Sequence, residues 1–265
     1  MTVSLRHKDV AERFVKEKLA DHWKVDGSSE SFALLLEHIE KTANFRSFFE
    51  EALNTAFIEL DSLKKKDNLV VYDVGSGVSW TSAIMARYNR IKHLYAVDPS
   101  EERLKHAKYI MRHFQVPEGK ADLITGTFSK FPAPEKADMI VYAASFHHCY
   151  DSGLQSLFSR AKEILAPGGI ILITNEHYVN RFFIMKRIFE ALKGKHLFSD
   201  LRNIRAPHPF DGEHWRTRGE INDIFAQNEF RFNIHVHTGD LCKDKKNLIS
   251  KLAFKYYYAI LQRLD

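Results

Sequence analysis

Residues 69–80 read LVVYDVGSGVSW, and this stretch decides the fold of the chain. Its first four residues, from Leu69 to Tyr72, are aliphatic or aromatic and uncharged, which is typical of a strand buried on both faces of a parallel sheet. Gly75 and Gly77 follow, and they permit a tight turn that exposes backbone amides. A helix beginning near Ser79 points its positive N-terminal end at that turn. The stretch therefore predicts an α/β fold with a cofactor cradle at the end of this strand.

Asp98 is the second signal, because it ends the apolar run HLYAVD of residues 93–98. A carboxylate at the carboxyl end of the strand beside the glycine turn can accept hydrogen bonds from both hydroxyls of a ribose. Ser100 is expected to cap the next helix, whose first turn holds Glu101 and Glu102 near the positive end of the helix dipole. This strand, acid and helix together predict a nucleoside-binding unit.

The remaining pattern predicts alternating helices and strands. Apolar residues at three- to four-residue spacing predict helices over residues 1–66. The helix after the glycine turn is expected to run to about Arg90, and Pro167-Gly168-Gly169 is expected to stop the helix over residues 154–165. A capping box from Thr217 to Glu220 predicts one more helix. Further strands are predicted at residues 121–125, 138–143 and 170–174.

Composition limits the class of protein. The chain of 265 residues has an ordinary apolar fraction of 45%, which suits one α/β domain with additions or two small domains. Cys149 and Cys242 are the only cysteines, the first residues are charged, and no apolar run approaches the roughly 20 residues of a membrane span. These features lead us to expect a soluble protein of the reducing cytoplasm.

Four motifs together carry a family resemblance. From Asp73 onward the spacing is D-x-G-x-G-x-G with Ser79 for the third glycine, whereas a dinucleotide fingerprint needs Gly or Ala where Trp80 stands. With Asp98, the SFHHC loop of residues 145–149, and a PGG before an apolar strand, the chain resembles class I S-adenosylmethionine (SAM) dependent methyltransferases of the small-molecule type. The resemblance implies a seven-stranded Rossmann-like sheet with residues 230–237 and 254–264 as its antiparallel last strands. It also implies a helical cap over 1–66 and a SAM-binding domain over 67–265, with 178–216 as a basic helical lid inserted after the fifth strand.

The resemblance further indicates which residues hold SAM. Thr127 stands where the family commonly has an Asp that meets the adenine amino group, so adenine recognition is expected to rest on backbone groups near Phe128. The residues expected to bind the cofactor are Asp73, Gly75, Ser76, Gly77, Asp98, Pro99, Thr127, Phe128 and Ala143.

Methyl transfer is an in-line displacement, in which the enzyme aligns acceptor and methyl and adds a base when the acceptor must lose a proton. Candidate bases lie where strands end or in the insertion, and His147 and His177 are the first choices. No ligand spacing forces a metal site, so none is assigned. Cys149 lacks the preceding proline of cytosine-C5 methyltransferases and is expected to be an ordinary buried thiol. The full set of catalytic candidates is His147, His148, Glu176, His177 and His214.

The charge is concentrated in one stretch. Residues 181–205 hold seven basic and two acidic side chains, a surplus that equals the net charge of +5 of the whole chain. Such a stretch suits either a solvated helix face or a surface for an anionic substrate, nucleic acid or lipid head groups. The favoured function is methyl transfer to an oxygen or nitrogen of a small molecule, an anionic one among the candidates. The alternatives are an RNA methyltransferase and a non-catalytic member of the fold that binds a partner protein, and the oligomeric state is left open.

Overall fold

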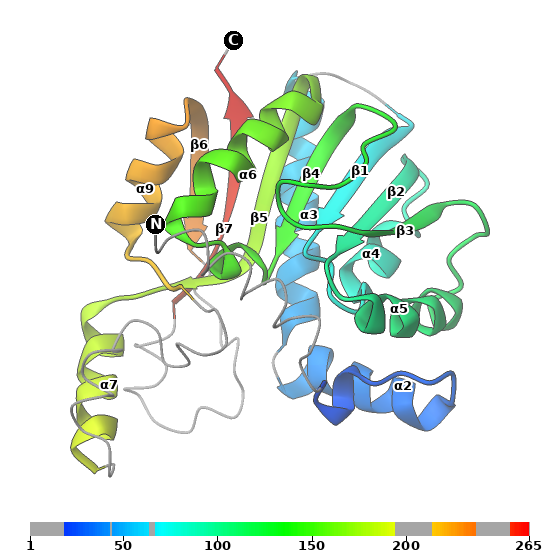
Figure 1. Cartoon of the computed structure of the whole chain (residues 1–265), viewed down its shortest axis with the longest axis horizontal. Helices are drawn as coiled ribbons and strands as arrows, with labels where there is room; N and C mark the ends of the chain where they lie inside the picture. The colour runs from blue at the N-terminus through cyan, green and yellow to red at the C-terminus, as the bar shows by residue number, and fades with distance from the viewer. Residues whose placement is uncertain (1–18, 43, 64–66, 194–213, 237–254, 265) are drawn as a thin grey trace.

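The computed structural model describes residues 19–42, 44–63, 67–193, 214–236 and 255–264. Seven strands form one sheet in the order β3-β2-β1-β4-β5-β7-β6, and β7 runs antiparallel to both of its neighbours (Figure 1). The predicted seven-stranded sheet with an antiparallel end is confirmed. The strands are β1 (Leu69–Val74), β2 (Ile91–Asp98), β3 (Ala121–Thr125), β4 (Ala137–Ala143), β5 (Leu165–Tyr178), β6 (Phe230–Val236) and β7 (Lys255–Arg263).

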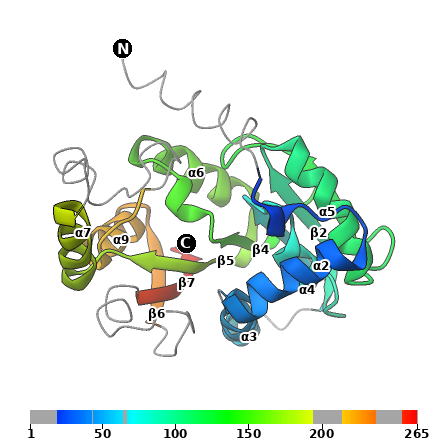
Figure 2. The same ribbon diagram turned by 90° about the horizontal axis from the view of Figure 1, so that it is seen from below.

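Helices cover both faces of the sheet because the central strands bury alternate side chains on opposite sides. In β4, Met139 and Val141 pack with α3, α4 and α5, whereas Ile140 and Tyr142 pack with α6 and α9. The result is three layers, with the sheet in the middle (Figures 1 and 2). The helices are α3 (Phe45–Leu63), α4 (Trp80–Met85), α5 (Glu101–His113), α6 (Asp151–Ile164), α7 (Arg181–Lys193) and α9 (Arg218–Gln227).

The helical N-terminal region has two parts. The short elements η1 (Asp21–Trp23), α2 (Ser29–Leu36) and η2 (Glu37–Thr42) lie together near one end of the molecule (Figure 1). In contrast, α3 buries Phe48, Phe49 and Leu53 in the core of the sheet. The helix predicted around Val10 and Phe14 lies outside the described residues, and the boundary at residue 66 stays a prediction.

Two predicted boundaries were wrong. The helix after the glycine turn ends at Met85 rather than near Arg90, because Leu69 N–H donates to the Arg90 carbonyl (2.8 Å) and draws the chain into β2 from Ile91. The PGG sequence does not precede β5 but lies within it. Leu165 already pairs with Ala137, and the strand is irregular before regular pairing with β4 resumes at Ile170. A side chain on Gly169 would stand 2.9 Å from the Ala137 carbonyl oxygen, so the strands approach closely there.

The capping box predicted from Thr217 to Glu220 is present at the start of α9. Ser100 caps α5 as expected, accepting a hydrogen bond from Arg103 N–H. Residues 194–213, which include half of the predicted basic lid, lie outside the described residues. Among the residues that are described, no helix is both long and apolar enough to cross a bilayer.

Candidate active site

A cavity of about 890 Å³ opens at the carboxyl ends of β1, β2, β4 and β5. Open α/β sheets bind ligands at this edge. The loops that follow neighbouring strands lead to helices on opposite faces of the sheet, and a crevice opens between these loops. Residues from all four strand ends line it, and so do Trp23 and Phe45 from the N-terminal region. Its size lies within the range of roughly 300–1,000 Å³ that is usual for small-molecule sites.

The glycine turn forms the floor of the cavity. Gly75 (φ +76°) and Gly77 (φ +57°) both adopt left-handed backbone conformations, which glycine reaches without strain. The N–H groups of Gly75 and Ser76 donate to the Val97 carbonyl at 2.8 and 2.9 Å, and this ties the turn to β2. A Cβ on Gly75 would stand 2.7 Å from Ser145 Cβ, so a side chain there would strike the protein itself. Gly77 has room, since the nearest atom to its Cβ position would be Arg103 Nη1 at 3.8 Å.

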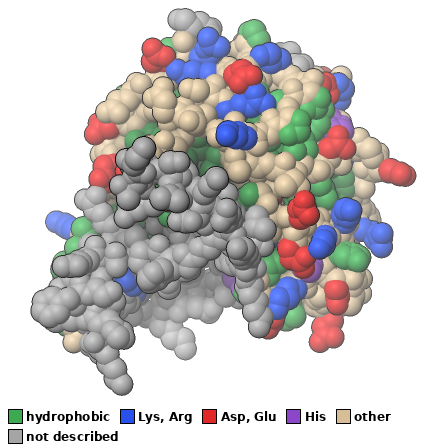
Figure 3. Space-filling model, in the orientation of Figure 1, with side chains coloured by type: hydrophobic (Ala, Val, Ile, Leu, Met, Phe, Trp, Pro, Cys, Tyr) green, Lys and Arg blue, Asp and Glu red, His purple; other side chains and the backbone are tan. Residues whose placement is uncertain are grey.

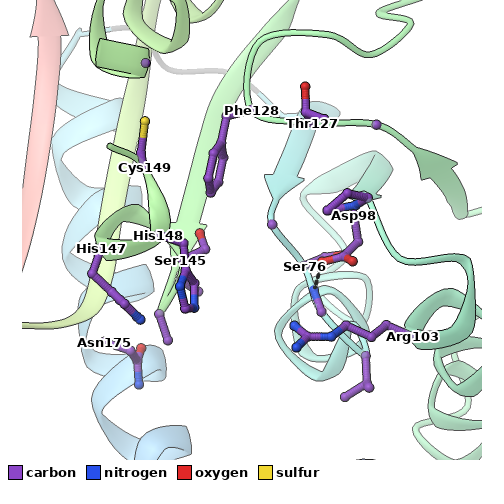
Figure 4. A pocket seen from close by; sticks show the side chains of 18 of the residues that line it. Ser76, Asp98, Arg103, Thr127, Phe128, Ser145, His147, His148, Cys149 and Asn175 are labelled. Carbon is purple, nitrogen blue, oxygen red and sulfur yellow. Dashed lines mark hydrogen bonds between the residues drawn. The ribbon is translucent and has the colours of Figure 1, made fainter. Parts of the chain in front are cut away.

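Asp98 lies beside this floor with 3% of its surface exposed. Its Oδ2 accepts from Gly77 N–H (2.8 Å; Figure 4). Its Oδ1 accepts from Ser100 N–H (2.9 Å). Burial raises the pKa of Asp98 to about 6, an effect that the charge of Arg103 partly offsets. Each carboxylate oxygen has a second acceptor site, so the side chain can still take hydrogen bonds from two hydroxyls.

Asp73 does not line the cavity, although it was expected to contact the cofactor. It is fully buried beneath the turn, and its Oδ2 accepts hydrogen bonds from the hydroxyls of Thr81 (2.7 Å) and Ser82 (2.5 Å). Burial raises the pKa of Asp73 to about 6. Its position therefore supports the first turn of α4 from below instead of facing the cavity.

The remaining predicted cofactor residues all line the cavity. Gly75, Ser76, Gly77, Asp98 and Pro99 lie on one side of it, together with Arg103, whose guanidinium extends toward Ser76 in Figure 4. Thr127 and Phe128, which follow β3, and Ala143, which ends β4, also line the cavity, and in Figure 4 the Phe128 ring lies between the histidines and Asp98.

His147 and Glu176 form a pair across two strands. His147 lies in η3 (Phe146–His148), directly after β4, and Glu176 lies near the end of β5. The ring Nδ1 of His147 is 2.9 Å from Glu176 Oε2, and Glu176 Oε1 accepts the Phe146 N–H at 2.8 Å. Glu176 is 1% exposed and does not line the cavity, whereas His147 does. A carboxylate thus holds the imidazole from behind while the ring meets the cavity.

The other candidate histidines occupy different positions. His148 and His177 line the cavity, with the His148 ring 4.1 Å from the His147 ring, and the His177 ring 3.7 Å from Trp215. His214 is not among the lining residues. The Nε2 of His214 lies 3.2 Å from Asp151 Oδ2. The backbone N–H of His214 donates to the carbonyl of His147 (2.7 Å), so this residue contacts the loop after β4 through its main chain.

Several lining residues were not predicted from the sequence. Asn175 (φ +56°) donates from its side chain to the Phe45 carbonyl (3.0 Å), which joins the end of β5 to the start of α3. The Ser145 hydroxyl donates to the Val74 carbonyl (3.0 Å) and fixes the loop after β4 to the end of β1. The sequence could have pointed to Arg103, because it is a cation in the first turn of a helix, where the helix dipole favours acidic residues. An unfavourable charge at such a position indicates a role outside the helix.

The lining fits a nucleoside-type cofactor on the Asp98 side. A carboxylate with two unused acceptor sites lies beside a turn that carries no side chains at Gly75 and Gly77, and the aromatic ring of Phe128 lies on the same cavity. A family model described as a methyltransferase domain matches residues 71–169, the segment that builds this side. The chain is a methyltransferase that resembles the class I SAM-dependent enzymes.

Relatives of this methyltransferase include uncharacterized methyltransferases of Geobacillus kaustophilus and Bacillus cytotoxicus. The first is 25% identical over 174 residues, which cover 64% of this chain and 73% of the relative. The second is 25% identical over 146 residues, which cover 55% of this chain and 60% of the relative, less than two thirds of its length.

Two solved structures show the same fold. A magnesium protoporphyrin IX methyltransferase from Synechocystis with bound S-adenosylhomocysteine is 10% identical, with a TM-score of 0.54 and coverage of 97% of this chain and 94% of that one. The YjhP protein of E. coli is 17% identical, with a TM-score of 0.55 and coverage of 81% and 92%. The first of these structures holds S-adenosylhomocysteine, the product that SAM leaves after methyl transfer.

We expect Gly77→Ala to weaken SAM binding by roughly tenfold, because a methyl group added to the open floor would occupy space beside the cofactor. Gly119→Ala is the matched control, since Gly119 also has a left-handed φ of +72° and nothing within 4 Å of its Cβ position, but it does not line the cavity. Both changes should cost about 1–2 kcal/mol of stability, the strain of a left-handed non-glycine residue. Calorimetric titration with SAM and thermal unfolding measure the two effects. Equal SAM affinities in the two variants would place the cofactor away from Gly77.

Proposed function

We propose that this methyltransferase moves the methyl group of SAM to an oxygen or nitrogen of a small molecule, with His147 as the general base. The observation that carries the proposal is the pair of Glu176 and His147, whose ring lies on the same cavity as Asp98 and the glycine turn. SAM supplies an electrophilic methyl group when it is bound. The protein must then align the acceptor in line with that methyl and accept the acceptor's proton.

The geometry of the pair sets the direction of proton transfer. When the Nδ1–H of His147 donates to the Glu176 carboxylate, the neutral ring carries its lone pair on Nε2. That nitrogen accepts the proton of a hydroxyl or ammonium acceptor, and the buried carboxylate stabilises the imidazolium that forms. Glu176 is a positioning residue in this scheme, because it lies behind the ring and outside the cavity lining. His148 and His177 line the same side and are candidates for contacts with the acceptor.

The acceptor side of the cavity supports a small molecule. Aromatic rings from distant parts of the chain line it: Trp23, Phe45, Trp215 and Tyr256. Among the described residues that line the cavity, Asp98 is the only acidic one, whereas Arg103 and Lys130 are basic, which favours a neutral or anionic acceptor. One neighbour in fold is described as a methyltransferase of magnesium protoporphyrin IX, a small molecule.

Thiol chemistry finds no support. Burial raises the pKa of Cys149 to about 12, so its thiol stays protonated at neutral pH and is a poor nucleophile. RNA remains the second, less favoured acceptor class.

We also propose that residues 1–66 and 178–216 act as the cap and the basic lid of the SAM-binding domain over 67–265, since Trp23, Phe45 and Trp215 from these segments line the cavity.

Label transfer tests the function. The protein is incubated with methyl-labelled SAM and cell extract, and the label is then followed into small-molecule, RNA and protein fractions. We expect label in the small-molecule fraction, and none with the Asp98→Ala variant. Label that enters RNA alone would favour the alternative enzyme, and SAM binding without any transfer would favour a non-catalytic role.

A further inference from the structure

Helix α7 presents an apolar stripe to solvent. Met185, Ile188, Phe189 and Leu192 follow one another at helical spacing, and they are 46%, 37%, 53% and 62% exposed. They account for four of the nine large hydrophobic side chains that are exposed among the described residues. The helix lies at the edge of the molecule, away from the sheet, in both ribbon views (Figures 1 and 2). Single exposed apolar residues are normal on a protein, but a continuous stripe marks an interaction surface.

The opposite side of α7 is fixed to the body of the protein. Phe183 is 1% exposed and packs with Val179 and Trp215, with its ring 5.2 Å from the Trp215 ring. Asn180 holds the start of the helix, because its Oδ1 accepts the N–H groups of Phe182 (2.9 Å) and Phe183 (3.0 Å). The orientation of the stripe is therefore set by packing on the inner face, and the stripe points outward.

The net charge of α7 helps to decide whether this surface binds a second copy of the chain, nucleic acid or lipid. The sequence of α7 contains four basic residues and one acidic residue, Glu190. On the face seen in Figure 3, acidic and basic side chains of the described residues are intermixed. A second copy of this chain, docked stripe to stripe, would bring two helices of like net charge together, which is unfavourable. Nucleic acid would engage the cations but would leave four large apolar side chains in water.

An anionic lipid surface satisfies both features. A helix lying in the plane of such a surface buries its apolar stripe roughly 5–10 Å into the boundary between head groups and acyl chains. Arg181, which is exposed and lies one helical turn before Met185 on the side of the stripe, can place its charge among the phosphates. We propose that α7 is a docking helix that binds the protein peripherally to anionic lipid surfaces, with Met185, Ile188, Phe189 and Leu192 as the inserted residues. This inference does not rest on the nature of the methyl acceptor.

Flotation with lipid vesicles tests the proposal. The probes are phosphatidylcholine vesicles with and without phosphatidylglycerol. We expect the full-length protein to float with the vesicles that contain phosphatidylglycerol and not with pure phosphatidylcholine, and raised salt should weaken this binding. The double variant Phe189→Ser with Leu192→Ser should lose more than tenfold in vesicle affinity, because each side chain buries apolar area in the bilayer.

Ile58→Ser is the matched control. Ile58 is 70% exposed on α3, a helix that lies apart from α7 in Figures 1 and 2, so its replacement removes a similar apolar side chain without touching α7. This control should bind vesicles as the unaltered protein does. The charge variant Arg181→Gln should lose about fivefold in affinity for the anionic vesicles. Unaltered SAM affinity and unfolding temperature will show that each variant is folded.

Any of four results would overturn the proposal. The first is absence of vesicle binding by the unaltered protein. The second is equal loss in the Ile58→Ser control and the stripe variant. The third is a concentration-dependent dimer in sedimentation that the stripe variant abolishes, which would assign the stripe to a second copy. RNA that competes fully with the anionic vesicles and binds the stripe variant normally would assign the cations to nucleic acid instead.

Discussion

Asp98→Ala should lower the affinity for SAM by about 10²–10⁴-fold. Two charge-assisted hydrogen bonds to ribose hydroxyls, at about 1.5–3 kcal/mol each, are lost with the carboxylate. The carboxylate also holds Gly77 N–H and Ser100 N–H, so its removal loosens the cofactor side of the cavity. Calorimetric titration with SAM measures the change. Undiminished affinity in a folded variant would remove Asp98 from the cofactor site.

Asp138→Asn provides the matched control for this experiment. Asp138 is also fully buried and accepts a backbone hydrogen bond, from Val70 N–H at 2.9 Å, but it lies at the amino end of β4 and does not line the cavity. This change should lower the unfolding temperature and leave SAM affinity within about twofold. The Asp98→Asn variant keeps the shape of the side chain and replaces Asp98→Ala if the latter does not fold.

SAM affinity should also depend on pH through the same residue. The pKa of Asp98 is raised to about 6 in the free protein, so the carboxylate is mostly protonated at pH 5 and mostly ionised at pH 7. Since the ionised form is the one that accepts hydrogen bonds from two hydroxyls, affinity should rise about tenfold from pH 5 to pH 7. The Asp98→Asn variant should lack this rise. A rise that persists in it would point to Asp73, whose pKa is also about 6.

The side of the cavity around Asp98, where we propose that the cofactor binds, was predictable because it is built from local sequence. Asp98 ends its own strand, Gly77 lies in the turn after β1, and Asp98 binds the Gly77 N–H across neighbouring strands. Parallel pairing of β1 and β2 brings these two strand ends together, and the glycine spacing marks one of them in the sequence. The burial of Asp73 beneath the turn was not predictable in this way, because a strand pattern does not tell whether the last side chain points into the cavity or beneath the turn.

The side of the cavity around His147 could be predicted only as separate residues. His147 and Glu176 were both candidates, but their contact depends on Ala143 of β4 pairing with Thr174 of β5, a register that the sequence does not specify. Trp23 and Phe45 reach the cavity from the N-terminal region through packing between distant segments. The requirement for glycine at position 75 likewise comes from Ser145, which stands 70 residues further along the chain and 2.7 Å from the Cβ position.

His147→Gln should lower kcat for methyl transfer by about 10²–10⁴-fold, the usual contribution of a general base. SAM affinity should stay within about twofold, because His147 lies on the acceptor side of the cavity. The rate is measured as label transfer from SAM to the small-molecule fraction.

His93→Gln is the matched control. The Nε2 of His93 is 3.0 Å from Asp122 Oδ2, a similar pair of imidazole and carboxylate that does not line the cavity. Its replacement should leave kcat unchanged.

Glu176→Gln separates a positioning role from a purely structural one. If the carboxylate acts through the imidazole, the double variant with His147→Gln should be no slower than His147→Gln alone, because residues that act as a unit are not additive. If Glu176 only anchors the loop through the Phe146 N–H, its replacement should slow the His147→Gln enzyme further and weaken SAM binding as well. We expect the first result, with KM for the acceptor changed less than kcat. If the losses in kcat of the two single variants add in the double variant, Glu176 does not act through His147.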